Sequence, residues 1–232
     1  MEYFYVPPSH VASPRLVIDG EEFQHLTHVM RKQPGDEIRV VDGKGNVYDV
    51  RIMDTARRAA HCEILAHRKM ENEPEISVTL AAGVLKNGAR FDFLVEKATE
   101  LGVRAIVPLA TARTIPQHAK TDRWQKLAVA AMKQSGRCVL PVVHPLTPLS
   151  KFVAESSASR KLIPHEKETS RTLRDVVAGG RTDTVLCIGP EGGFSDDEVA
   201  IAVQAGFVTV SLGPRRLRTE TASITAVAMV LT

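Results

Sequence analysis

The chain has 232 residues, a length that suits one large domain or two modest ones and that can bury a sizeable core. Hydrophobic residues make up 44% and charged residues 25%, which is an ordinary globular composition. The formal net charge of +3 is too small to establish a nucleic-acid partner by itself, so that argument requires local clusters of basic residues.

The cysteines exclude some classes of protein. Cys62, Cys138 and Cys187 are far apart and form no C-x-x-C pair, so we expect no disulfide framework and no metal site, and a reducing cytoplasm fits. The N-terminal segment lacks the basic and long apolar regions of a signal peptide. Because no run of about 18 apolar residues exists, we expect no membrane span.

Residues 1–72 have the pattern of a small β-domain. Apolar and polar residues alternate in four segments, which predicts strands at 15–19, 37–42, 45–54 and 60–68. The sequence DGKGN at 42–46 predicts a hairpin turn, and one short helix is predicted over 21–31. The segment 67–75 is charged and contains Pro74, so it is interpreted as a linker between domains 1–72 and 73–232.

The second domain alternates strands and helices. Strands are predicted at 76–84, 105–111, 161–166, 184–189 and 208–213. Helices are predicted at 89–103, 121–136, 195–205 and 220–232. This alternation is typical of an α/β domain with a mainly parallel sheet.

The sequence CIGPEGGFSDDEV places a glycine-rich loop between a buried strand and a helix. Ser195 and Glu198 form a capping-box pattern that begins the helix, so GPEGG lies at the carboxyl end of a parallel strand. Ligands bind at that end in open α/β sheets, and glycine leaves main-chain groups free to contact them.

A second loop, SLGPRRLRTETAS at 211–223, also follows a strand and precedes a helix. Two such loops can form the walls of one pocket. Each is also compatible with an ordinary strand-to-helix turn, and neither matches the P-loop or G-x-G-x-x-G patterns.

Four motifs occur together in order: KATELGV, QSGR, IGPEGGFSDDE and SLGPRRLRTETA. With HLTHVMRKQPGD near the N-terminus, they resemble the ribosomal RNA small-subunit methyltransferase E family of the SPOUT superfamily. The resemblance covers nearly the whole chain. It implies methylation of N3 of a uridine in 16S ribosomal RNA with S-adenosylmethionine. It also implies a homodimer, a PUA-like N-terminal β-barrel that binds RNA and a C-terminal α/β domain with a trefoil knot.

By the same resemblance, three segments would bind the cofactor. The expected cofactor-binding residues are Leu162, Pro164, His165, Ile188, Gly189, Pro190, Glu191, Gly192, Leu212, Gly213, Leu217, Arg218, Thr221 and Ala222. His165 is also a candidate base, although a histidine beside a strand end is more often a packed, hydrogen-bonded residue.

The reaction suggests two catalytic candidates. The uracil N3–H is weakly acidic, so a site must favour loss of its proton or spread the negative charge that results. Arg218 can do the second, because a guanidinium stays charged and offers a planar set of donors. Glu220 can accept the proton or orient Arg218. The alternative for Arg218 is a residue at the helix start that pairs locally with Glu220.

Basic residues near these motifs are candidates for contacts to RNA phosphates. They are Arg31, Lys32, Lys86, Arg90, Arg113, Arg137, Arg215 and Arg216. A solvated surface position is the alternative for each of them. Two other functions stay open: a non-catalytic RNA-binding dimer module, and a SPOUT methyltransferase that acts on another RNA position.

Overall fold

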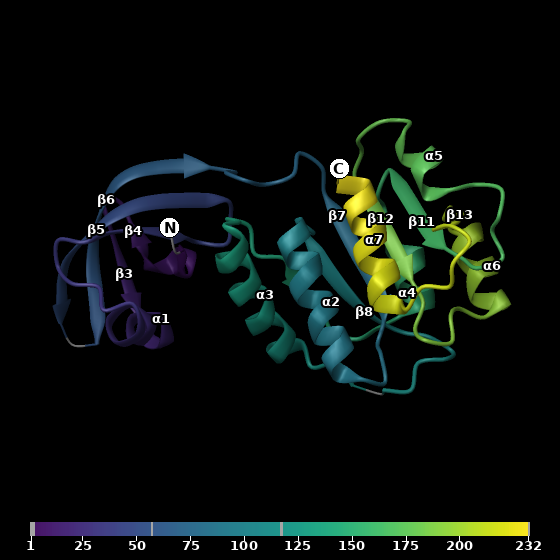
Figure 1. Ribbon diagram of the computed structural model, residues 1–232, viewed down its shortest axis with the longest axis horizontal. Helices are drawn as coiled ribbons and strands as arrows, with labels where there is room; N and C mark the ends of the chain where they lie inside the picture. The colour runs from purple at the N-terminus through teal and green to yellow at the C-terminus, as the bar shows by residue number, and fades with distance from the viewer. Residues whose placement is uncertain (1–2, 57, 117, 232) are drawn as a thin grey trace. The chain divides into compact units, whose positions relative to one another are not determined.

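The computed structural model describes residues 3–56, 58–116 and 118–231. The chain forms two compact units (Figure 1). The first consists of Met1–Glu73 with Val129–Leu140, and the second consists of Pro74–Ala128 with Pro141–Thr232. The segment 129–140 therefore groups with the N-terminal unit, although it lies within the range 73–232 that the sequence assigns to the second domain.

The N-terminal unit is built on one sheet with the strand order β1-β4-β5-β6-β3-β2. All its strand pairs are antiparallel except β1 with β4. Its core contains Phe4, Leu16, Ile18 and Val40. The strands are β1 Tyr3–Tyr5, β2 Val11–Ala12, β3 Arg15–Asp19, β4 Glu37–Val41, β5 Asn46–Ala56 and β6 Ala59–Lys69.

The predicted hairpin turn at 42–46 is confirmed. Val41 pairs with Val47 across β4 and β5. The Asp42 carboxylate accepts hydrogen bonds from the Lys44 amide at 2.8 Å and from Asn46 Nδ2 at 2.6 Å. Such an acidic side chain closing its own turn is a common way to stabilise a tight reversal of the chain.

The helix predicted over 21–31 has two different parts. A short α1, Gly20–Gln24, continues into a π-helical turn η2, His25–Val29, in which the Met30 amide donates to the His25 carbonyl at 3.0 Å. The Thr27 hydroxyl donates to the Phe23 carbonyl at 2.8 Å. Such side-chain bonding competes with the backbone ladder and distorts a helix, which periodicity does not reveal. A 3₁₀ turn, η1 Pro8–His10, precedes β2.

The predicted linker begins too early. β6 continues to Lys69, because its last residues have partners on β5. The rings of Tyr48 and His67 stack at 4.9 Å between centroids, and Arg68 Nη1 lies 2.7 Å from an Asp49 carboxylate oxygen. Charged residues at 67–69 are thus strand residues held by cross-strand pairs.

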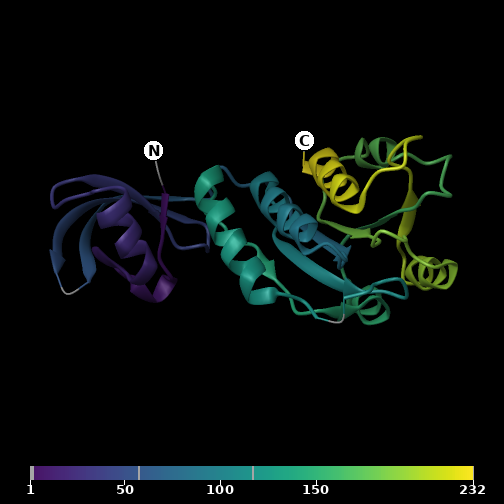
Figure 2. The ribbon, with the colours of Figure 1, turned by 60° about the horizontal axis from the view of Figure 1, so that its bottom comes forward.

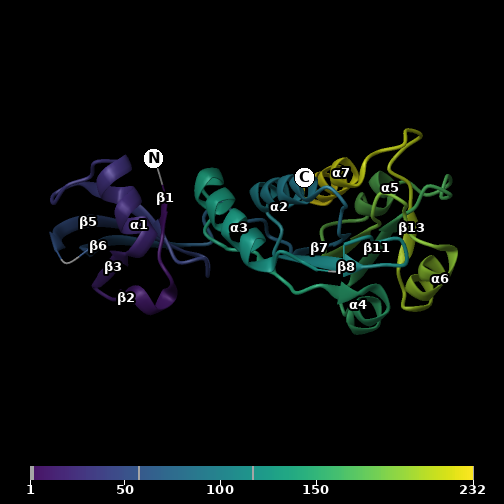
Figure 3. The ribbon, with the colours of Figure 1, turned by 90° about the horizontal axis from the view of Figure 1, so that it is seen from below.

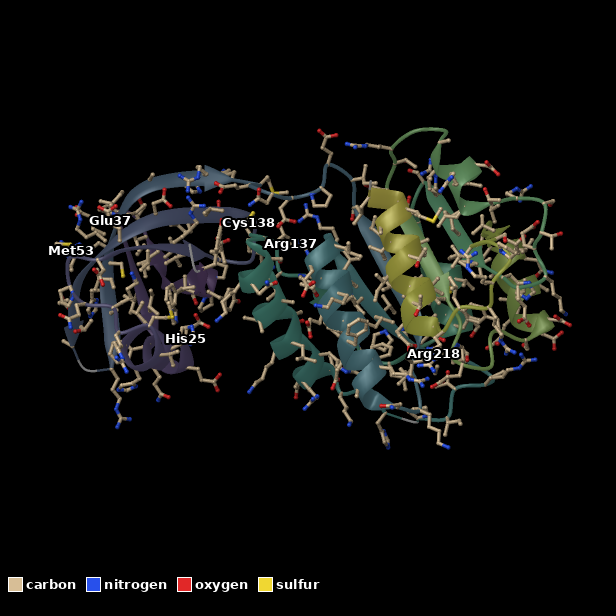
Figure 4. The ribbon with its side chains drawn as sticks, in the orientation of Figure 1. His25, Glu37, Met53, Arg137, Cys138 and Arg218 are labelled. Carbon is tan, nitrogen blue, oxygen red and sulfur yellow. The ribbon has the colours of Figure 1, made fainter. Side chains whose placement is uncertain are left out.

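Arg137, one of the residues predicted to contact RNA, is buried. Its guanidinium Nη2 lies 2.7 Å from Glu73 Oε2, and the two side chains are 2% and 1% exposed. Glu73 Oε1 also accepts the amide hydrogens of Cys138 and Val139 at 2.9 Å. Figure 4 labels Arg137 and Cys138 at the end of α3. A buried guanidinium needs a charged partner, and Glu73 occupies that place instead of a phosphate.

The C-terminal unit confirms the predicted parallel sheet. Its strand order is β10-β8-β7-β12-β11-β13, with β9 paired to β8, and every pair is parallel. The strands are β7 Val78–Gly83, β8 Ala105–Ala110, β9 Val142–Val143, β10 Thr147–Pro148, β11 Arg160–Pro164, β12 Thr184–Ile188 and β13 Val208–Val210.

Helices cover both faces of this sheet. α2 and α7 pack together on one face, whereas α4 and α6 pack on the other (Figure 3). The helices are α2 Gly88–Leu101, α3 Thr121–Ser135, α4 Leu149–Glu155, α5 Leu173–Val177, α6 Asp196–Gln204 and α7 Thr219–Leu231. The four predicted helices are present, but the short α4 and α5 were not predicted.

The described residues contain no helix that is long and apolar enough to cross a membrane. Within the same ranges, no group of three or more His, Cys, Asp or Glu side chains is placed to hold a metal ion. Cys62, Cys138 and Cys187 are free and buried, and burial raises the pKa of the Cys138 thiol to about 11.

Candidate functional site

The glycine-rich loops meet at one edge of the parallel sheet. β7, β12, β11 and β13 are neighbours in that order and run in the same direction. The loops that follow them, 84–87, 189–194, 165–171 and 211–218, therefore leave the same edge. This brings together the three segments that the resemblance assigned to the cofactor, at the place where open α/β sheets bind ligands.

The loop after β12 lies directly against the end of β7. A Cβ atom added to Gly83 would lie 2.6 Å from Pro190, and one added to Gly189 would lie 3.0 Å from the Gly193 backbone. Glycine is therefore required at these positions for the main chains to approach. Glu191, which is exposed, accepts the Lys86 amide hydrogen at 3.1 Å.

The start of α6 fixes the other end of this loop. The predicted capping box is confirmed, since Ser195 Oγ accepts the Glu198 amide hydrogen at 3.2 Å and Glu198 Oε2 accepts the Ser195 amide hydrogen at 2.8 Å. The second carboxylate oxygen, Glu198 Oε1, accepts the Ala112 amide hydrogen at 2.7 Å. One side chain thus caps the helix and holds the loop after β8.

Arg113 also belongs to this loop assembly. Its guanidinium donates to the Gly192 carbonyl, and a Cβ added to Gly192 would meet Arg113 Cδ at 3.1 Å. The side chain lies across the glycine loop, so in this conformation its guanidinium serves loop structure. Lys167 of the β11 loop pairs with Asp196 at the start of α6, and this pair lowers the pKa of Asp196.

The loop after β11 is held by hydrogen bonds. Leu162 is buried, whereas Pro164 and His165 are half-buried. The His165 amide donates to the Val210 carbonyl at 3.0 Å, and its ring Nδ1 accepts the Lys167 amide hydrogen at 3.2 Å. His165 is therefore a hydrogen-bonded residue of a local turn, which was the alternative to its role as a base.

Sequence reasoning missed Glu168, which organises the rest of this loop. Its carboxylate accepts hydrogen bonds from the Ser170 amide at 2.9 Å, the Ser170 hydroxyl at 2.7 Å and the Arg171 amide at 3.1 Å. It also accepts one from Thr209 Oγ1 of β13 at 2.9 Å. These donors, first among them Ser170, lower the Glu168 pKa to about 2. The spacing Glu-x-Ser is the signal that could have identified the turn.

The loop before α7 presents its arginines to solvent. Gly213 has a φ of 106°, a left-handed conformation that favours glycine. Arg215, Arg216 and Arg218 are exposed, and no ion pair to them occurs within the described residues. The Arg218 carbonyl accepts the Ala222 amide hydrogen at 2.8 Å, which places Arg218 at the beginning of α7 (Figure 4). Leu212, Leu217 and Ala222 are half-buried, and Thr221 is exposed.

Glu220 faces α2. Its Oε1 lies 3.7 Å from Arg90 Nε, and the side chain of Glu220 is 11% exposed. Its other oxygen, Oε2, is buried and has no hydrogen-bond partner among the described residues, and the same holds for Ser223 Oγ. The local pair between Arg218 and Glu220, which was the alternative for Arg218, is not among the ion pairs of the described residues, and Glu220 lies beside Arg90 instead.

The basic residues predicted to contact RNA now fall into separate groups. Arg90, Arg113 and Arg137 have protein partners. Lys86, Arg215 and Arg216 are exposed around the loops of the C-terminal unit. In the N-terminal unit, Arg31 is exposed and follows the π-helical turn with a φ of 53°, and Lys32 is half-buried.

Comparison with known proteins identifies the family. The sequence model of an RNA methyltransferase domain matches residues 71–231, and that of an RNA methyltransferase PUA domain matches residues 18–65. Ribosomal RNA small subunit methyltransferase E of Synechocystis is 34% identical over 97% of this chain and 75% of its own. The chain belongs to the ribosomal RNA small subunit methyltransferase E family. The same-named protein of Mycobacterium bovis is 32% identical, over 98% of this chain and 90% of its own.

Solved structures of this family have the same fold. A ribosomal RNA small subunit methyltransferase E from Neisseria gonorrhoeae, bound to S-adenosyl methionine, has a TM-score of 0.88 and 33% identity, covering 98% of this chain and 95% of its own. A Legionella pneumophila methyltransferase in complex with the bound cofactor SAM has a TM-score of 0.87 and 32% identity, covering 98% and 96%. The expectation of an RNA methyltransferase, made from four ordered motifs, is confirmed.

Proposed function

We propose that this protein transfers the methyl group of S-adenosylmethionine to N3 of a uridine in 16S ribosomal RNA. The observation that carries the proposal is that two glycine-containing loops leave the same end of the parallel sheet, and that one of them carries exposed arginines with no ion-pair partner among the described residues. Two relatives with the same fold contain this cofactor in their solved structures, which supports the choice.

The three loops fit such a cofactor. Among the described residues, no atom beyond its chain neighbours lies within 4 Å of a Cβ added to Gly213, so its main chain is open to a ligand, and the half-buried Leu212 and Leu217 offer apolar surface for an adenine ring. The remaining residues of the proposed pocket are Leu162, Pro164, His165, Ile188, Gly189, Pro190, Glu191, Gly192, Arg218, Thr221 and Ala222. When bound, the cofactor supplies an electrophilic methyl group on a positively charged sulfur.

Two side chains would act on the uracil. Arg218, exposed at the start of α7, would donate hydrogen bonds to the O2 or O4 that gains negative charge. Glu220 Oε2, buried and without a donor, would accept the N3 proton. The N3–H electron pair then forms the new N–C bond, and the electrons of the C–S bond remain on sulfur, so charge and atoms balance.

RNA contacts would come from both units. Lys86, Arg215 and Arg216 would neutralise phosphates near the loops, while Arg31 and Lys32 would do so from the N-terminal unit. Arg90 and Arg113, which have protein partners, are less suited to this role than the sequence suggested.

The path of the chain supports the proposed knot. After the edge strand β13, the chain returns past β11 so that α7 packs on β7 and β12. On this path Ser211 hydrogen-bonds with the connection between β11 and β12, accepting the Leu173 amide hydrogen at 2.9 Å and donating to the Arg171 carbonyl at 2.8 Å. In a knotted chain the last segment would pass through this connection, and it would then lie against it as Ser211 does.

In the N-terminal unit, register shifts between Asp49 and Val50 and between Ile52 and Asp54 support a barrel. Such irregularities bend paired strands and help a sheet to curl towards closure.

α7 supports the proposed homodimer. Its sequence, TETASITAVAMVL, is apolar on nearly all sides, and such a helix is normally surrounded by protein. Within one chain, however, Ile224, Met229 and Leu231 stay partly exposed. A second copy would cover them. We place the dimer in the cytoplasm, with 16S ribosomal RNA or the small ribosomal subunit as its partner.

Nucleoside mass spectrometry tests the proposed reaction. Small ribosomal subunits lacking the modification are incubated with the protein and S-adenosylmethionine, and the expected product is 3-methyluridine. A methyl group on ribose or on another base atom would show that a different position is the target. Cofactor binding without any product, measured by calorimetry, would contradict the reaction, and the absence of binding would favour a non-catalytic RNA-binding module.

A further inference from the structure

We infer that Arg90 is a positioning residue for Glu220 and not a contact to an RNA phosphate. The inference rests on the proposed function, in which Glu220 accepts the N3 proton. Arg90 Nε lies 3.7 Å from Glu220 Oε1, and only 34% of the Arg90 side chain is exposed. A guanidinium turned towards a buried carboxylate is poorly placed to reach a phosphate in solvent.

The two helices that carry this pair run side by side in the same direction (Figures 1 and 2). Arg90 and Glu220 lie in their first turns, and at the other end Leu231 Cδ1 lies 3.5 Å from where a Gly102 Cβ would be. The first turn of α2 is itself fixed, because Asn87 Oδ1 accepts the Ala89 amide hydrogen at 3.0 Å. Arg90 therefore presents its guanidinium from a rigid element.

The two oxygens of Glu220 have different surroundings. Oε1 faces Arg90, whereas Oε2 is buried and finds no hydrogen-bond partner in the part of the chain that the structure describes. Ser223, three residues further along the same helical face, also has a buried hydroxyl without a partner. Burial of a hydrogen-bond acceptor without a donor costs free energy, so we expect a bound molecule to supply the donor. In the proposed reaction that donor is the uracil N3–H. Arg90 would fix Oε1 and so direct Oε2 towards it.

A phosphate contact and a residue that positions Glu220 predict different experimental results for Arg90. A phosphate contact contributes to RNA affinity and to its salt dependence, and has no effect on the rate once RNA is saturating. A positioning residue changes the rate at saturation, because a misplaced proton acceptor slows the chemical step. The substitutions Arg90→Gln and Arg90→Lys remove and keep the charge, respectively. Lys97→Gln is the matched control, because Lys97 lies on the same helix and pairs with Glu96 and Glu100.

The experiment measures single-turnover methylation at saturating RNA and S-adenosylmethionine, together with both dissociation constants. For Arg90→Gln we expect a rate that falls by about 10- to 100-fold, with both dissociation constants within about twofold of wild type. Arg90→Lys should recover part of the rate, and Lys97→Gln should leave it unchanged. An unchanged rate with weaker, less salt-sensitive RNA binding would overturn the inference.

A double substitution separates positioning from general loss of structure. In a Glu220→Gln background, Arg90→Gln should cause no further loss of rate, because the group that it positions is already gone. Additive losses would show that Arg90 acts independently of Glu220 and would overturn the inference. If the wild-type protein produced no methylated nucleoside, the proposed function would fail before Arg90 was tested.

Discussion

The arginines of this protein show how the surroundings of a side chain decide its role. Arg137 is buried against Glu73, and Arg113 donates to the Gly192 carbonyl, while Arg218 is exposed at the start of α7. A guanidinium keeps its charge at any ordinary pH, so burial is tolerated only with a partner. The sequence shows where arginines are but not which acidic group or carbonyl lies beside each, so its list of RNA contacts was too broad.

Arg218 gives the most direct test of the proposed chemistry. We expect Arg218→Ala to lower the single-turnover methylation rate by about 100-fold or more, because it removes a donor to the charge that develops on the uracil. Its affinity for S-adenosylmethionine, measured by calorimetry, should fall by much less than the rate, because Arg218 is one of many residues in the proposed cofactor pocket. Arg216→Ala is the control and should weaken RNA binding while keeping the rate at saturation. Near-wild-type turnover of Arg218→Ala would remove Arg218 from the mechanism.

At the level of the structural elements, the close contact of β7 with the loop after β12 depends on Gly83, because glycine has no side chain. A Cβ at Gly83 would lie 2.6 Å from Pro190, so Gly83→Ala must push the two main chains apart. We expect a loss of about 1–3 kcal/mol in the free energy of unfolding, measured by urea denaturation, as for other overpacked sites. Cofactor affinity should fall as well.

Gly88→Ala is the matched control. Its new methyl group would have only Lys120 Nζ nearby, at 3.6 Å, and alanine suits the first turn of α2. This variant should be as stable as wild type or slightly more so. Equal stability of the Gly83 and Gly88 variants would contradict the close approach of β7 and the glycine loop.

The turn after β11 should make stability depend on pH through Glu168. Its folded-state pKa of about 2 lies below the usual value of 4.5 for a free glutamate, so its stabilisation is present above pH 4.5 and is lost as pH falls towards 2. Glu168→Gln should therefore lower the melting temperature at pH 7, and the difference from wild type should shrink below pH 4.5. Glu166→Gln, at an exposed neighbour, should have little effect. A difference independent of pH would contradict the role of this carboxylate.

Periodicity and capping patterns predicted most elements but not their irregularities. The presence of α2 and the capping box of α6 depend on residues close in sequence, and both were predicted correctly. Neither the π-helical turn after α1 nor the extent of β6, where Arg68 meets Asp49 across the sheet, follows from such local patterns. The Arg90–Glu220 pair joins residues 130 positions apart, and no local pattern indicates such a contact.

For the whole molecule, the proposed RNA contacts predict a strong salt dependence. If Arg31, Lys32, Lys86, Arg215 and Arg216 neutralise phosphates, the logarithm of RNA affinity should fall linearly with the logarithm of salt concentration. The double variant Arg215→Gln, Arg216→Gln should reduce the slope by about 0.7–0.9 for each contact removed. Fluorescence anisotropy across a salt series measures this, and a flat response in the wild-type protein would rule out the basic contacts.

The buried pair of Arg137 and Glu73 limits where the chain can be divided into fragments that fold separately. Tyr3, Val41 and Val47 pack against Met132, Cys138 and Val139, so the N-terminal unit takes part of its apolar interior from residues far along the chain. A fragment ending at residue 73 would leave that surface open and the Glu73 carboxylate without its cation. An exchange of the N-terminal unit for that of another protein must therefore carry both of its segments, 1–73 and 129–140.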